Sequence, residues 1–141
     1  MGKKDYALAK YYFDEAQKQG STDAANNLPI LSLKRGDYEN AEKQLKNDNC
    51  SYNLAFAQLM NDETSTCIRT LDCCLDQNAD VNYLRAVAYA RLGDKANAFK
   101  NLQASVDEEY DYKKKAKIDP EFRAYWDDEE FKLIVKLYKK K

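Results

Sequence analysis

The stretch "LKRGDYENAEKQL", residues 33–45, decides the fold of this chain. An apolar segment stops at a Gly-Asp pair, and Tyr38, Ala41 and Leu45 then follow at intervals of three and four. Those intervals place the three side chains on one stripe of an α-helix. Glycine adopts the positive φ that ends a helix, and aspartate caps the next helix by accepting backbone N–H bonds. The stretch therefore predicts a helix end, a tight turn and the start of a second helix.

The apolar stripe of this stretch occurs four times along the chain, with positions separated by three, four and three residues. The four sets are Tyr6, Ala9, Phe13, Ala16; Tyr38, Ala41, Leu45, Asp48; Thr64, Cys67, Leu71, Cys74; and Lys95, Ala98, Leu102, Ser105. The copies start at 6, 38, 64 and 95, so the periods are 32, 26 and 31 residues. The short period predicts that the helix after Tyr38 ends near Lys46. Because a second apolar segment precedes three copies, at residues 22–35, 51–61 and 81–92, the chain is predicted to be all-α and built from helical pairs.

The composition agrees with helices and excludes several classes of function. The chain has 141 residues and 44% hydrophobic content, which suits one domain or a short piece of a repeat array. With 23 Lys plus Arg against 24 Asp plus Glu, the net charge of −1 offers no general attraction for nucleic acid. Apolar runs such as "LPILSL" are too short to span a bilayer, so we expect no membrane insertion. Two prolines and four glycines are too few for the turns of a β-rich fold.

The repeated unit resembles the tetratricopeptide repeat (TPR), a helix-turn-helix unit of about 34 residues, over roughly residues 4–107. The residues that carry the resemblance are Leu28, Gly36, Asp37, Tyr38, Ala41 and Leu45 in the second copy and Ala86, Tyr89, Gly93, Asp94, Ala98 and Leu102 in the fourth. Three features depart from the family: Pro29, Asp48 and the "NDET" turn of the third copy. The resemblance implies a right-handed solenoid that forms part of a longer bacterial protein.

The segment "KAKIDPEFRAYWDDEEFKLIVKL" resembles the helices that close arrays of this family. Asp119 is expected to cap a helix that has Pro120 in its first turn. Asp127 and Asp128 are expected to begin a last helix. That helix would carry Phe131, Ile134, Val135 and Tyr138. The predicted organisation is therefore repeats over residues 1–109 and C-terminal capping helices over residues 110–141.

The first copy lacks the helix that should precede Tyr6. The uncovered helix would expose Leu8, Tyr11 or Phe13. The chain is therefore expected to be the C-terminal part of a longer array. Self-association through this N-terminal helix is a further expectation.

No catalytic residue, metal ligand or cofactor is predicted. The chain has no histidine, which removes the commonest general base and metal ligand. The acidic pairs Asp127-Asp128 and Glu129-Glu130 are explained by the start of a helix. The lysine-rich "YKKKAK" and "LYKKK" are interpreted as a solvated helix face and a helix end rather than as a nucleic-acid site. An enzyme is the disfavoured reading.

The four cysteines allow more than one interpretation. Cys67 and Cys74 fall on the repeat stripe, where cysteine acts as a compact buried hydrophobe. Cys73 points about 100° away around the helix, so these three thiols do not suit one tetrahedral metal. Structural thiols are therefore the main prediction. The alternatives are a disulfide that involves Cys50 or Cys73, and a thiol-redox module.

The resemblance also implies a ligand groove on the concave face, lined by the first helix of each pair. Carried over copy by copy, the groove positions are Asn26, Ile30 and Leu33; Asn49, Tyr52, Phe56 and Leu59; and Tyr83, Val87 and Ala90. Aromatic and asparagine side chains suit a peptide or a helix. Of the clamp that chaperone-tail-binding members use to hold a carboxylate, only Asn53 fits. An equally weighted alternative is that Tyr52 and Phe56 pack against the cap or adjacent copies.

The predicted function is a non-enzymatic protein-protein interaction scaffold that binds a peptide, helix or partner subunit in the concave groove. The alternative is a structural spacer or assembly module of a larger bacterial envelope protein, with the groove filled by its own chain. The stretch "SYNLAFAQL" resembles repeat segments of bacterial envelope proteins, which favours a periplasmic or outer-membrane-associated location over a cytoplasmic one.

Overall fold

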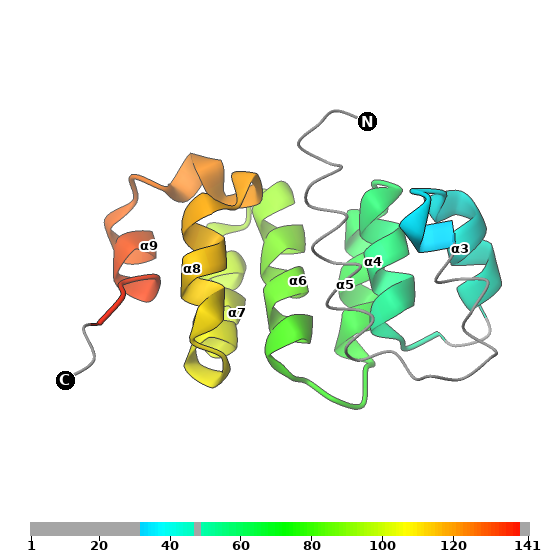
Figure 1. Ribbon diagram of the computed structural model, residues 1–141, viewed down its shortest axis with the longest axis horizontal. Helices are drawn as coiled ribbons and strands as arrows, with labels where there is room; N and C mark the ends of the chain where they lie inside the picture. Colours follow the sequence, from blue (N-terminus) through cyan, green and yellow to red (C-terminus); the bar gives the residue numbers. More distant parts are fainter. Residues whose placement is uncertain (1–31, 47–48, 139–141) are drawn as a thin grey trace. The chain divides into compact units, whose positions relative to one another are not determined.

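The computed structural model describes residues 32–46 and 49–138 of the chain. Every regular element in these ranges is helical and none is a strand, which confirms the predicted all-α class. The elements are α3 Tyr38–Leu45, α4 Tyr52–Met60, α5 Thr64–Asp72, α6 Ala79–Arg91, α7 Lys95–Glu108, α8 Asp111–Ile118, the 3-10 helix η2 Pro120–Tyr125, and α9 Glu129–Ile134 (Figure 1). The first copy of the stripe, with the groove residues Asn26 and Ile30, lies outside the described ranges.

The chain divides into two compact units, Met1–Leu75 and Asp76–Lys141. The predicted boundary between residues 109 and 110 therefore lies inside the second unit. The capping segment belongs to the same compact unit as the helical pair α6 and α7.

Three turns of the same geometry end helices within the described residues. Gly36, Asp62 and Gly93 have φ values of 75°, 63° and 74°. Each donates its N–H to the carbonyl three residues earlier, and the following residue donates to the carbonyl five residues before it. This pair of bonds defines the Schellman motif that ends a helix. The turns recur at the predicted periods of 26 and 31 residues, and the "NDET" copy keeps the turn because aspartate tolerates a left-handed backbone better than most residues.

Aspartate side chains cap the helices that follow the two glycine turns. Asp37 accepts a bond from Asn40 N at 3.4 Å, and Asp94 accepts one from Asn97 N at 3.2 Å. Glu63, which holds the same place before α5, makes no such side-chain bond. The predicted Gly-Asp signal is therefore confirmed in both copies that contain it.

In the first unit, α4 packs against α3 on one side and α5 on the other. The stripe residues Ala41, Leu45, Cys67 and Leu71 are buried, as predicted. α3 ends at Leu45 with Lys46 as its C-cap, which confirms the shortened helix. The described part of this unit is thus held by helix-to-helix contact along the small and large residues of the stripe.

In the second unit, α6 packs against α7, and the capping segment covers both helices. Figure 1 shows η2 crossing the upper ends of α6 and α8, with α9 beyond α7 and α8. The side chain of Asp119 caps η2 by accepting a bond from Glu121 N at 3.0 Å, and Pro120 occupies the first turn. Asp128 caps α9 by accepting bonds from Glu130 N and Phe131 N, at 2.9 and 3.2 Å. The predicted cap at Asp119 is therefore confirmed, and of the two aspartates expected to begin the last helix, Asp128 caps it and Asp127 lies in the turn before it.

The last helix is shorter than predicted. α9 stops at Ile134, Val135 is its C-cap, and Tyr138 lies beyond the helix. Beyond the end of α9, backbone N–H and C=O groups form hydrogen bonds with side chains of α8 and of its N-cap residue. Lys113 Nζ donates to Lys136 O at 2.9 Å, and Tyr138 N donates to Tyr110 Oη at 3.1 Å. The ammonium of Lys113 also stands 4.6 Å from the ring centre of Tyr138.

Candidate functional site

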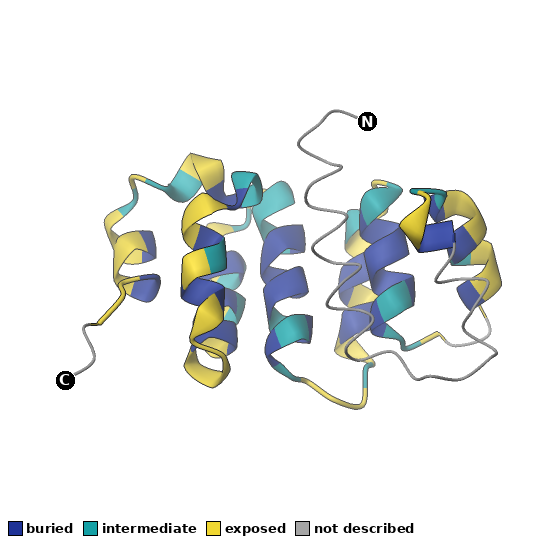
Figure 2. Cartoon of the chain, in the orientation of Figure 1, coloured by how far each residue is buried: buried dark blue, intermediate teal, exposed yellow. Residues whose placement is uncertain are grey.

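The predicted groove residues of the first unit belong to its core. Tyr52 and Phe56 are buried on α4, and Phe56 meets the ring of Tyr38 edge-on with centroids 5.8 Å apart. Asn53 is half-buried on the same helix. α4 is buried on most of its circumference (Figure 2), as expected of a helix that is apolar all round. Tyr52 and Phe56 therefore serve packing within the chain, and Asn53 is left as the accessible groove position on this helix.

The predicted groove residues of the second unit are covered by the capping segment. Tyr83 and Val87 on α6 have no exposed surface. The ring of Tyr83 stacks on Tyr112 of α8 at 4.4 Å and meets Phe122 of η2 edge-on at 5.7 Å. Its hydroxyl donates to Asp119 Oδ2 at 2.6 Å. The capping segment thus covers the surface of α6 on which a ligand was predicted to bind.

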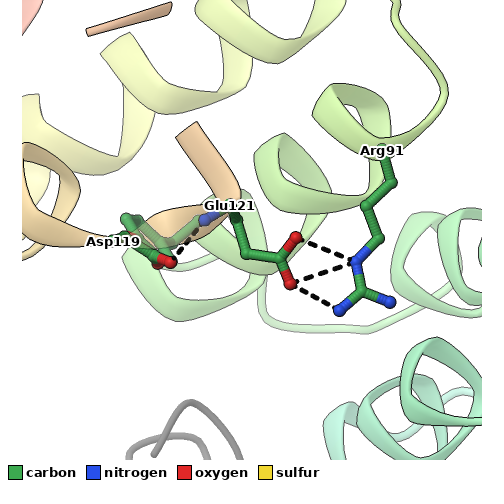
Figure 3. Close-up of polar contacts among 4 residues, drawn as sticks. Arg91, Asp119 and Glu121 are labelled. Atoms are coloured by element: carbon green, nitrogen blue, oxygen red, sulfur yellow. Dashed lines mark hydrogen bonds and ion pairs between the residues drawn. The ribbon is translucent and has the colours of Figure 1, made fainter. Parts of the chain in front are cut away.

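Polar contacts join the capping segment to both ends of α6. At its C-terminal end Arg91 Nε donates to both carboxylate oxygens of Glu121 at 3.1 Å, and an Nη2 contact completes the pair (Figure 3). Near its first turn the hydroxyl of Tyr112 bonds to the carboxylate of Asp80. Two charge-assisted contacts at opposite ends fix the orientation of the covering segment.

Asp119 is the titratable group at the centre of this covered face. Burial raises the pKa of its carboxyl above the usual value, although the bonds from Tyr83 and from Glu121 N oppose the shift. A raised carboxyl pKa in a cleft is a signal of acid-base chemistry. Here the carboxyl of Asp119 has no exposed surface and caps a helix, so its hydrogen bonds have a structural role.

The second unit also carries an open pocket that the sequence reasoning did not predict. The pocket has a volume of about 310 Å³ and lies between the end of α8, the end of η2 and the α9 segment. Its lining residues are Lys117, Trp126, Phe131, Lys132, Val135, Lys136 and Leu137. We call it the cap pocket. The available signal was the alternation of lysine with apolar residues in "FKLIVKL", which was predicted only as part of the last capping helix.

Large apolar side chains are exposed on the same capping segment. Ile118 and Leu133 expose 72% and 68% of their surface, and Tyr138 exposes 63%. Leu137, which lines the cap pocket, is also exposed. Figure 2 shows this contrast, since α6 has buried and intermediate residues but no exposed one, while α8 and α9 present exposed turns. Several exposed apolar side chains on one segment are typical of an interaction surface.

The cysteines correct one prediction of the sequence analysis. Cys50 and Cys73 form a disulfide with Cα atoms 5.2 Å apart, so the interpretation of all four as thiols is wrong and the alternative pairing holds. Cys50 precedes α4 and Cys73 is the C-cap of α5. In an antiparallel hairpin the residue before the first helix meets the residue after the second, which brings the two sulfurs together. Cys67 is a buried free thiol, as predicted, and Cys74 is a half-buried one.

A polar hollow of about 400 Å³ lies in the first unit, beside the turn between α4 and α5. It is lined by Glu39, Glu42, Lys43, Lys46, Asn61 and Glu63. Partial burial raises the pKa of Glu63, and repulsion from the Glu42 carboxylate adds to the shift. Asn61 Nδ2 donates to Glu42 Oε1 at 2.9 Å and to Tyr38 O at 3.0 Å. Within residues 32–46 and 49–138, no group of three or more histidine, cysteine, aspartate or glutamate side chains is arranged to hold a metal ion.

Among the helices that the structure describes, none combines the length and apolarity that a membrane crossing requires. In comparisons with family models, with curated proteins and with solved structures, nothing matches the chain.

Proposed function

We propose that this chain is a non-enzymatic module of TPR-like helical pairs that acts by binding another protein. The observation that carries the proposal is the recurrence of one turn, at Gly36, Asp62 and Gly93, between helices packed in pairs. Repeats of this kind form a rigid surface, so binding does not require ordering of the backbone.

The binding surface of the second unit is placed on its cap in this proposal, and not on the inner helix α6. Tyr83 and Val87 would have to lose the cap before a peptide could reach them. Exposed apolar surface is instead present at Leu133 and Tyr138. An interaction through an already exposed face costs no rearrangement of the core.

Site-specific photocrosslinking tests the proposal. A benzophenone side chain is introduced at Leu133 on the cap, at Lys100 on α7, or at Arg69 on α5, all of which are exposed positions. Each folded chain is irradiated in extract from the source cells. A discrete protein adduct from one position and not from the other two supports a defined binding surface. Absence of a protein adduct from all three positions, or the same mixture of many adducts from all three, would contradict the proposal.

A second candidate is the structural spacer or assembly module, and the covered face of α6 favours it. Tyr83, Tyr112 and Phe122 fill that face with the chain's own side chains. The Cys50–Cys73 disulfide supports an oxidising compartment for either candidate, since structural disulfides persist outside reducing cytosol. The crosslinking experiment separates a binding module from a spacer, because a spacer whose surfaces bind nothing gives no discrete adduct.

A further inference from the structure

We infer that the cap pocket binds an acidic peptide segment of a partner protein, which inserts one bulky apolar side chain and sets carboxylates against the lysines around it. The inference rests on the proposed function and names the chemistry of its partner. It is carried by two features of the pocket: a fixed apolar floor and a basic rim.

The floor of the pocket is apolar and held from behind. Phe131 and Val135 line the pocket but keep only 2% and 4% of their surface exposed. The ring of Phe131 packs against Phe122 at 5.8 Å and Phe99 at 6.0 Å. Trp126 is tied to α8 by a bond from its Nε1 to Ala116 O at 3.4 Å. A floor fixed in this way can receive a leucine or phenylalanine side chain at low entropic cost.

The rim is basic, and no acidic side chain lines the pocket. The three charged lining residues are Lys117, Lys132 and Lys136. Lys132 has an exposed pairing with Glu129 at 3.2 Å, which solvent weakens. Within the described part of the chain, no carboxylate forms an ion pair with Lys117 or Lys136. The pocket therefore complements an apolar side chain that has negative charge on its flanks.

The same features favour a peptide over single-stranded nucleic acid. Stacking of bases needs open aromatic faces. Trp126 is the chain's one tryptophan, and the guanidinium of Arg123 stands over its ring at 5.7 Å. The other apolar walls include Val135 and Leu137, which are aliphatic. The chain as a whole has a net charge of −1 and gives no broad field for phosphates.

Fluorescence of the single tryptophan is a direct readout of the pocket. The purified chain is titrated with an acetylated ten-residue peptide in which two leucines are flanked by glutamates. Two control peptides replace the glutamates with lysine or the leucines with serine. We expect a saturable change of Trp126 emission with the first peptide and affinities at least about tenfold weaker with both controls. Raising the salt concentration should lower the affinity for the first peptide several-fold.

A matched pair of variants completes the test. Lys117→Glu with Lys136→Glu should weaken the acidic peptide at least about tenfold. Lys100→Glu with Lys114→Glu makes the same change of charge at exposed positions that do not line the pocket. This control should bind like the wild type, and equal helical circular dichroism shows that both variants are folded.

Four outcomes of the titrations with peptides and oligonucleotide would overturn the inference. They are no saturable change, equal binding of the lysine peptide, equal loss in both double variants, and a stronger response to a single-stranded oligonucleotide than to any peptide. An emission change that depends on protein concentration alone would assign the pocket to a second copy of the chain, which also overturns it. A discrete photocrosslinked partner from Lys100 or Arg69, together with failed titration, would leave the proposed function standing.

Discussion

The hydroxyl of Tyr83 donates a 2.6 Å hydrogen bond to the buried carboxyl of Asp119, across 36 positions of sequence. This bond joins the inner helix α6 to the N-cap of η2. It explains why a side chain predicted to contact a ligand has no exposed surface. In the described structure, the cap is part of the core of the second unit.

Replacement of Asp119 by alanine should destabilise the second unit by roughly 2 to 4 kcal/mol, because it removes a helix cap and leaves the Tyr83 hydroxyl buried without its acceptor. Asp119→Asn keeps an acceptor oxygen, so its loss of unfolding free energy should be less than about half that of the alanine variant. Urea denaturation followed by circular dichroism measures both values. Equal losses in the two variants would contradict the role of the Tyr83 bond.

The pH dependence of Glu63 supplies a second prediction. Its carboxyl pKa is raised in the folded chain above the ordinary value of 4.5, so the folded state holds the proton more tightly. The free energy of unfolding therefore falls as the pH rises from about 4.5 through the raised pKa. Glu63→Gln should raise the denaturation midpoint at pH 7 and leave it unchanged well below pH 4. A variant that is less stable than the wild type at pH 7 would contradict this sign.

The left-handed turn at Gly93 supplies a third prediction. A β-carbon built on Gly93 meets no atom within 4 Å, so Gly93→Ala creates no clash. Its φ of 74° nevertheless disfavours alanine, and the variant should lose roughly 1 to 2 kcal/mol. Ala104→Gly, at an exposed site within α7, is a control for the loss of helix propensity and should cost about 1 kcal/mol. Thermal or urea denaturation measures both, and an unchanged Gly93→Ala chain would contradict the turn geometry.

Removal of the disulfide should destabilise the first unit. Cys50→Ser opens a bridge across 23 positions and should cost roughly 3 kcal/mol through the gain in unfolded-chain entropy. Cys74→Ser, beside the bridge but outside it, should cost less than about 1 kcal/mol. Denaturation with and without a reductant gives the comparison. If the reductant lowered the stability of Cys50→Ser as much as that of the wild type, the Cys50–Cys73 pairing would be wrong.

The local features of this chain were predictable from sequence because each depends on a few neighbouring residues. The Gly-Asp signal predicted the turns at Gly36 and Gly93, and the stripe predicted the buried positions of α3, α5 and α7. The cap at Asp119 followed from its residue type and from Pro120 after it, and the acidic pair Asp127-Asp128 predicted the start of the last helix.

The remaining features depend on what covers each face, which periodicity does not specify. The family resemblance implied that Tyr83 and Val87 line a ligand groove, but the residues that bury Tyr83 come from α8 and η2. The Cys50–Cys73 bridge likewise depends on the packing of α4 against α5. The cap pocket was missed because its floor and rim come from three separate helical segments.

The most direct test of this account is a nuclear Overhauser measurement between the rings of Tyr83 and Phe122 in the isotopically labelled chain. Their edge-on packing, with centroids 5.7 Å apart, predicts strong cross-peaks between the two rings at neutral pH. Those cross-peaks would establish that the cap fills the inner face of α6. Their absence, together with a Tyr83 ring accessible to a soluble paramagnetic probe, would contradict the account and return that face to the role of a ligand groove.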